Sequence, residues 1–185
     1  MSYLEITEYR VMPETAFKII RNCPGCTEKT HYRSTGSFRV NANGKRVDIW
    51  LIYQCEKCRH TYNLSLYERT NAADIPPGEY EKFQANDVGQ AFYYGTDKGV
   101  FRRNRAEIAW EVIPYRLESV SGSEKTGRRV YVDNPRALKV REDKIAAEIL
   151  GISRNQVKEL IRDERLEILK ESSGFSINFL NSLDR

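Results

Sequence analysis

The sequence predicts an α+β protein with β-hairpins near its N-terminus, a mixed middle segment, and a C-terminal helical hairpin followed by short strands. Three observations lead to this class. Strand-like runs surround two cysteine pairs, residues 141–161 carry apolar residues at helical spacing, and short alternating runs follow them. Of the 185 residues, 40% are hydrophobic, which is enough for a core and excludes a disordered chain.

Local patterns place most of the expected elements. The pair Asn43-Gly44 predicts a tight hairpin, because both residues tolerate positive φ. Two short helices are expected at residues 79–84 and 87–94, the second ended by Gly95, and a turn is expected over residues 121–127. Strands are expected at residues 3–11, 16–21, 38–42, 46–53, 62–67, 108–117 and 129–132.

All four cysteines fall into two pairs, Cys23 with Cys26 and Cys55 with Cys58, with 28 residues between the pairs. A gap of two residues bends the chain so that both sulfurs face one side, and two such turns supply the four thiolates of a tetrahedral zinc site. The expected hairpin carries the second pair back to the first. We therefore expect one structural Zn²⁺ bound by these four cysteines.

Disulfides and a redox dithiol are the alternatives for the cysteine pairs. A cytoplasmic chain keeps its thiols reduced, and neither pair is expected where a strand meets a helix, the place that activates a thiol. His31 and His60 are alternative ligands, although four thiolates already close the coordination shell. Four basic residues lie within three positions of a cysteine and are expected to screen the negative charge of the site: Arg21, Lys29, Lys57 and Arg59.

The cysteine-bearing stretch resembles a zinc ribbon, and residues 38–45 and 48–55 resemble the bacterial domain-of-unknown-function family numbered ten sixty-two. The family resemblance implies no activity. In zinc ribbons a glycine often follows the second cysteine of each pair, whereas Thr27 and Arg59 stand there in this sequence. Gly25 is expected to relieve strain in the first turn.

The middle segment interleaves basic and aromatic residues. Such a pattern can bind single-stranded nucleic acid, but a helix that buries its rings and leaves its arginines in solvent produces it too. Residues 71–135 hold 9 basic and 10 acidic residues, so we favour the helix. The interleaved residues are Phe92, Tyr93, Tyr94, Lys98, Phe101, Arg102, Arg103 and Arg105.

The C-terminal part predicts a helical pair. Residues 141–150 carry an apolar stripe that Gly151 ends, and Ser153 is a ready N-cap for the next helix. Short strands are expected at residues 166–169 and 175–179. A boundary near Asn134-Pro135 divides the chain into a zinc-ribbon domain with an α+β extension, 1–134, and a helical-hairpin segment, 135–185.

This helical pair resembles the α-L RNA-binding motif of ribosomal small-subunit protein four. Two departures are visible: Glu164 stands where a glycine is usual, and Leu169-Lys170 replace an Asn-Gly turn. The matching residues are Arg141, Asp143, Lys144, Leu150, Gly151, Ser153, Arg154, Lys158, Leu160, Ile161, Leu166 and Ile168.

The expected nucleic-acid contacts are Arg141, Lys144, Arg154, Lys158 and Arg162. The last three fall at i, i+4 and i+8 of one helix face, where they could follow consecutive phosphates. Residues 136–185 hold 10 basic and 9 acidic residues, so a salt-bridged helical hairpin in solvent is the main alternative. A DNA-binding helix-turn-helix is a weaker one.

The chain lacks a glycine-rich phosphate loop, a His-Glu-x-x-His motif and a nucleophile elbow, and a Cys₄ site leaves no open position for water. We therefore expect no catalysis and no small-molecule substrate. The net charge is +4, no apolar run approaches ~20 residues, and the first residues do not resemble a signal peptide, so a cytoplasmic protein without a membrane partner is expected. The sequence predicts a non-catalytic zinc-binding module that binds structured RNA through its C-terminal helices, with a zinc-stabilised protein–protein interaction module as the alternative.

Overall fold

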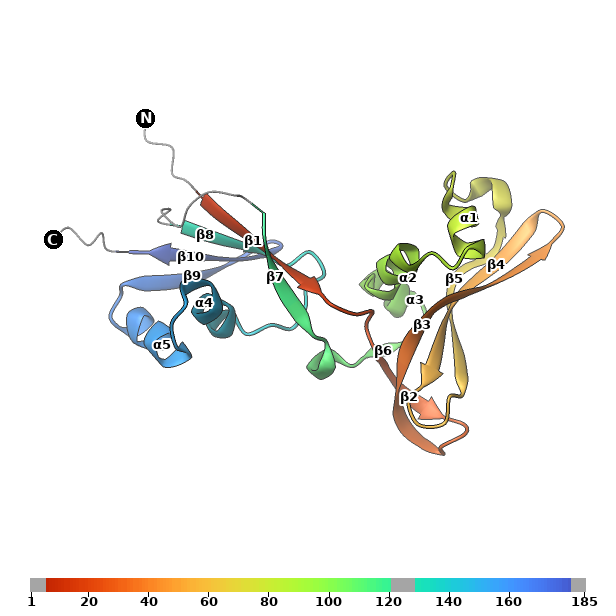
Figure 1. Ribbon diagram of the computed structural model, residues 1–185, viewed down its shortest axis with the longest axis horizontal. Helices are drawn as coiled ribbons and strands as arrows, with labels where there is room; N and C mark the ends of the chain where they lie inside the picture. The colour runs from red at the N-terminus through yellow and green to blue at the C-terminus, as the bar shows by residue number, and fades with distance from the viewer. Residues whose placement is uncertain (1–5, 121–128, 181–185) are drawn as a thin grey trace. The chain divides into compact units, whose positions relative to one another are not determined.

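A computed structural model describes residues 6–120 and 129–180 (Figure 1). Within these ranges the chain forms two five-stranded sheets and five α-helices, which confirms the α+β class. The chain divides into two compact units. We call Pro13–Pro114 the cysteine unit, and residues 1–12 with 115–185 the split unit. The boundary expected near Asn134-Pro135 falls inside the split unit, between its strand Arg129–Asp133 and its first helix.

The cysteine unit is built on an antiparallel sheet with the strand order β5-β4-β3-β2-β6. In the interior strand β4 every second residue is buried, from Val47 to Cys55, as expected for a strand with one face on the core. The strands are β2 (Ile19–Cys23), β3 (Glu28–Asn43), β4 (Arg46–Cys55), β5 (Thr61–Asn71) and β6 (Glu107–Ile108).

The β3–β4 hairpin turns one residue later than the sequence predicts. Asn43 pairs with Arg46 in the ladder, so the loop is Gly44-Lys45 and not Asn43-Gly44. Gly44 has a φ of 61°. Glycine at the first loop position is the requirement of a type II′ turn, whose twist suits a hairpin.

Three helices cover one face of this sheet (Figure 1): α1 (Glu79–Gln84), α2 (Val88–Gly95) and α3 (Lys98–Arg103), with a 3₁₀ turn, η1 (Ala72–Asp74), before them. The core beneath them is aromatic. The ring of Phe17 lies 5.7 Å from that of Phe101, and the Tyr53 hydroxyl donates to the Phe17 carbonyl at 3.0 Å. Helix α3 buries Phe101 and leaves Arg102 and Arg103 exposed, which confirms the helix interpretation of this basic and aromatic run.

The prediction of a single strand over residues 108–117 is wrong. Strand β6 ends at Ile108, and a 3₁₀ turn, η2 (Trp110–Val112), follows. The Trp110 ring packs 5.7 Å from that of Phe17, which draws this stretch into the core of the cysteine unit. Strand β7 (Tyr115–Ser119) begins only after Pro114, a residue that has no N–H for a ladder.

The split unit contains the second sheet, with the order β7-β1-β8-β10-β9. Strands β1 and β8 are parallel, whereas β10 pairs antiparallel with both β8 and β9. The turn expected over residues 121–127 lies outside the described residues. The remaining strands are β1 (Ile6–Pro13), β8 (Arg129–Asp133), β9 (Leu166–Glu171) and β10 (Gly174–Phe179).

Helices α4 (Glu142–Leu150) and α5 (Arg154–Arg162) lie on one side of this sheet (Figure 1). As predicted, Gly151 ends α4 with a φ of 68°, and Ser153 caps α5. The cap is a complete capping box, in which Ser153 Oγ accepts from the Gln156 N–H at 3.2 Å and Gln156 Oε1 accepts from the Ser153 N–H at 2.8 Å. None of the helices in the described ranges has the length and apolarity needed to cross a membrane.

Candidate metal centre

The four cysteine sulfurs converge at one end of the cysteine unit. All lie within 4.8 Å of one another, with Cys23 Sγ 3.4 Å from Cys58 Sγ and Cys26 Sγ 3.8 Å from Cys55 Sγ. A Zn–S bond of ~2.3 Å in a tetrahedron places the sulfurs about 3.8 Å apart, so the donor set fits Zn²⁺. A disulfide needs ~2.05 Å, and all four cysteines are free, so the disulfide alternative is wrong.

Each cysteine pair lies in a tight turn at the end of a strand. The Cys23 carbonyl accepts from the Thr27 N–H at 2.8 Å, and the Cys55 carbonyl accepts from the Arg59 N–H at 3.1 Å. His31 and His60 hold the second turn through their backbone, because their carbonyls accept from the N–H groups of Glu56 and Cys55, both at 2.9 Å. Their side chains are exposed, and the metal-ligating cluster found in the described ranges consists of the four cysteines alone.

The turns require a left-handed residue directly after the second cysteine. Thr27 has a φ of 58° and Arg59 a φ of 67°, which explains why glycine is common at these positions in zinc ribbons. The role expected for Gly25 is wrong, since Gly25 has no positive φ. Gly25 instead leaves room for a sulfur: a Cβ there would lie 2.9 Å from Cys58 Sγ.

Hydrogen bonds make the four thiols unequal. Burial opposes ionisation of Cys55, but hydrogen bonds from the Thr30 hydroxyl, at 3.2 Å, and from the N–H groups of Cys58 and Lys57 outweigh it and lower the pKa of Cys55 to about 6. The interaction with Cys58, followed by burial, raises the pKa of Cys26 to about 12. Because neighbouring thiolates repel one another, a cation is needed for all four to ionise together.

Thr30 and Tyr32 are site residues that the sequence analysis missed. Both side chains are buried, two positions apart on β3, and Tyr32 is the ladder partner of Cys55. Burial, followed by the interaction with Cys23, raises the pKa of the Tyr32 hydroxyl above its usual value. The alternation of β3 was the available signal, since Thr30 and Tyr32 are buried while their neighbours Lys29 and His31 are exposed.

Two of the four basic residues expected to screen the site are paired with carboxylates. Lys57 Nζ lies 2.5 Å from Glu28 Oε1, and Lys29 Nζ lies 3.5 Å from Glu107 Oε2. The remaining excess of positive charge beside the sulfurs is therefore smaller than the sequence suggests.

A family model described as "Protein of unknown function (DUF1062)" matches residues 40–172, more than half of the chain. The chain belongs to this family. The matched span includes Cys55, Cys58 and the α4–α5 pair, while Cys23 and Cys26 lie before it. No curated protein and no solved structure matches the chain.

In this DUF1062 protein the basic residues predicted to contact nucleic acid lie on α4, α5 and the residue before α4. Asp143 binds two of them: its Oδ2 accepts from Arg154 Nη2 at 2.8 Å, and its Oδ1 lies 3.3 Å from Arg141 Nε. Hydrogen bonds from Arg154 outweigh burial and hold the pKa of Asp143 below its usual value. The expected row of three free cations on α5 is thus interrupted at its first member.

The other three predicted contacts, Lys144, Lys158 and Arg162, are all exposed but differ in their neighbouring groups. Lys158 is exposed and makes no ion pair with the described residues, whereas Arg162 Nε lies 3.4 Å from Asp163 Oδ1. Lys144 Nζ lies 5.3 Å from the centre of the Tyr115 ring.

The two departures from the α-L motif have structural counterparts. Glu164 has a φ of 53°, the conformation that a glycine adopts without strain. Leu169-Lys170 do not form a turn, because β9 continues through them to Glu171 and the chain reverses at Ser172-Ser173.

Proposed function

We propose that this DUF1062 protein binds one zinc ion through Cys23, Cys26, Cys55 and Cys58, and that the ion has a structural role in a non-catalytic protein. The observation that carries this proposal is the convergence of four sulfurs, from two turns far apart in sequence, within 4.8 Å. Four thiolates saturate Zn²⁺ and leave no position at which water or a substrate could bind.

The position of the cluster supports a structural role. Cys23 ends β2 and Cys55 ends β4, while β3 and β5 begin just beyond the two turns, so one ion would hold four strands. Structural zinc supplies ~10–16 kcal/mol of apparent binding free energy, and a small domain is stable by only ~5–15 kcal/mol. The cysteine unit is therefore expected to fold only with its metal.

Metal analysis of protein purified without chelator tests this proposal. We expect about one zinc per chain in the natural protein, and less than half in Cys58→Ala. Cys58→His is the matched variant, because imidazole replaces thiolate as a zinc ligand, and it is expected to retain most of the metal. Less than half a zinc per chain in the natural protein would contradict the proposal.

We also propose that the α4–α5 pair binds structured RNA. The supporting observation is the chain path: α4, a left-handed Gly151, a capped α5 and then β9, the order of elements in the motif that this segment resembles. Lys158 and Arg162 lie on one exposed helix face, where each could neutralise one phosphate.

The RNA proposal is tested by the salt dependence of binding to a structured RNA. Replacing Arg154, Lys158 and Arg162 with Ala is expected to flatten the slope of log affinity against log salt by about 2 to 3 units, because each phosphate contact contributes ~0.7–0.9. The charge-matched control replaces three exposed residues of the cysteine unit with Ala: Arg33, Lys45 and Lys82.

Asp143→Asn gives a second, opposite test. It removes the carboxylate that binds Arg154, so RNA affinity is expected to rise. Negligible RNA affinity at physiological salt, or equal slopes in the two triple variants, would contradict RNA binding at this helix.

A further inference from the structure

A pocket of about 260 Å³ opens in the cysteine unit between β2, β5 and the loop that follows α3. Three cationic side chains line it, Arg21, Lys29 and Arg105, against one carboxylate, Glu107. Neither function proposed above assigns a ligand to this pocket, although Arg21 and Lys29 also flank the cysteine site. Its excess of positive charge indicates an anionic ligand.

The Arg21 guanidinium packs against aromatic rings, and its Nε–H has no hydrogen-bond acceptor among the described residues. Its guanidinium carbon lies 3.7 Å from the centre of the Tyr62 ring and 5.7 Å from that of Tyr32. Its Nε is buried, and no described residue accepts a hydrogen bond from it. A guanidinium whose flat face rests on a ring presents its N–H groups at the edge, the geometry that binds an oxyanion in the plane.

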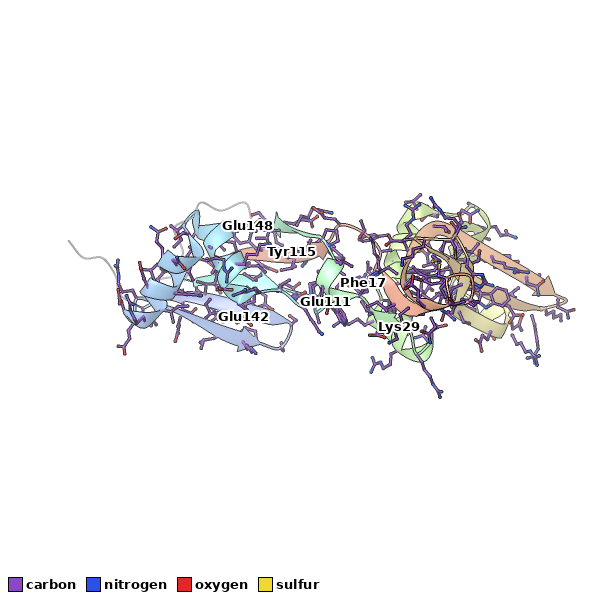
Figure 2. The ribbon with its side chains drawn as sticks, turned by 90° about the horizontal axis from the view of Figure 1, so that it is seen from below. Phe17, Lys29, Glu111, Tyr115, Glu142 and Glu148 are labelled. Carbon is purple, nitrogen blue, oxygen red and sulfur yellow. The ribbon has the colours of Figure 1, made fainter. Side chains whose placement is uncertain are left out.

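Two more cations, Arg105 and Lys29, line the pocket. Arg105 follows α3 and forms no hydrogen bond or ion pair through its side chain with the described residues. Its loop is fixed by Asn104, whose side chain accepts from the Ser65 N–H and donates to the Ser65 carbonyl, both at 2.8 Å. Lys29, labelled in Figure 2, is on β3, and its contact with Glu107 is long, 3.5 Å, between two exposed side chains.

We propose that this pocket binds the phosphate group of a small phosphorylated molecule. Two guanidinium groups and one ammonium group against a single carboxylate leave two positive charges, which match a phosphate dianion better than a carboxylate. The volume suits a small molecule. The acidic Glu107 in the lining disfavours a nucleic-acid strand, which needs a continuous basic track.

The pocket is tested by titrating the zinc-loaded protein with inorganic phosphate at constant ionic strength and following the arginine Nε–H signals by NMR. We expect saturable shifts at Arg21 and Arg105, and at least tenfold weaker binding in Arg105→Gln. Arg102→Gln is the matched control, since Arg102 is exposed on α3 and does not line the pocket, and it is expected to bind phosphate normally. Lys29→Gln, with its zinc content verified, is expected to weaken binding as Arg105→Gln does.

Two comparison ligands test which anion the pocket prefers. A small phosphate monoester is expected to bind at least as tightly as inorganic phosphate, and acetate at least tenfold more weakly. The proposal is overturned if the shifts do not saturate, if Arg105→Gln binds phosphate like the natural protein, or if acetate binds equally well. The proposal is also overturned if a single-stranded RNA shifts the same arginine signals and binds more tightly than either phosphate ligand.

Discussion

Arg59 keeps a left-handed backbone in the second cysteine turn, where a glycine would be unstrained. An L-residue costs about 1–2 kcal/mol in this conformation, and glycine loses about 0.5–1 kcal/mol through the entropy of the unfolded chain. Arg59→Gly is therefore expected to raise the unfolding free energy by about 0.5–1 kcal/mol. Urea denaturation of the zinc-loaded protein measures this gain.

Thr27 and Gly25 provide the comparisons for that prediction. Thr27→Gly should gain less, because the Thr27 hydroxyl donates to the Cys26 carbonyl at 2.7 Å. Gly25→Ala should weaken zinc binding, since its new Cβ would lie 2.9 Å from Cys58 Sγ. A loss of stability in Arg59→Gly would show that the arginine side chain contributes more than its backbone costs, contrary to the prediction.

Thr30 is expected to tune the metal centre through its hydroxyl, which lies 3.2 Å from Cys55 Sγ in a buried position. Thr30→Val preserves the shape of the side chain but removes this hydrogen bond. Partners that hydrogen-bond to metal ligands are worth roughly 10–100-fold in metal affinity, so we expect at least a tenfold loss, measured by competition with a chelator. Thr35→Val is the control on the same strand: its hydroxyl donates to the Ile52 carbonyl at 3.0 Å, and an equal loss there would refute the prediction.

The stability of helix α5 depends on its N-terminal cap. Only Val157 of its residues is buried, so its first turn relies on the capping box formed by Ser153 and Gln156. Ser153→Ala is expected to destabilise the helix by about 1 kcal/mol. Faster amide hydrogen exchange within α5 would report this loss, while Ser172→Ala, in an exposed turn, should leave the exchange unchanged.

The ion pair between Asp143 and Arg154 joins α4 to α5 and gives the pair a pH dependence. The folded-state pKa of Asp143 is lowered, so the stabilisation is present above the unfolded pKa of ~3.9 and is lost as the pH falls through the lower folded value. Arg154→Gln removes the main cause and is expected to raise the pKa of Asp143, measured from its carboxyl ¹³C shift. Arg162→Gln should leave it unchanged, and an equal rise in both variants would contradict this assignment.

At the scale of the whole molecule, all four cysteines lie in the cysteine unit, while the split unit has a core of its own that includes Val132, Phe175 and Ile177. Zinc removal is therefore expected to abolish amide protection in β2–β5 and to spare β8 and β10. Hydrogen exchange with and without chelator measures both units in one sample. Loss of protection in both sheets together would contradict separate stabilisation.

The sequence by itself determined the features that depend on near neighbours. The spacing of the cysteines identified the four sulfurs that converge, and the Gly151–Ser153 junction identified the end of α4 and the cap of α5. Such signals are readable because a turn or a cap is specified by residues within about four positions of one another.

Only the tertiary structure decided features that depend on distant residues. Strand β1 pairs in parallel with β8, more than a hundred residues later, and Trp110 leaves the expected strand to pack on Phe17. The pocket proposed to bind phosphate likewise brings Arg105 to Arg21 and Lys29, and no sequence motif connects Arg105 to that pair. Long-range strand pairing and the charge balance of a surface depend on which segments come into contact in the folded chain. Local sequence periodicity does not specify these contacts.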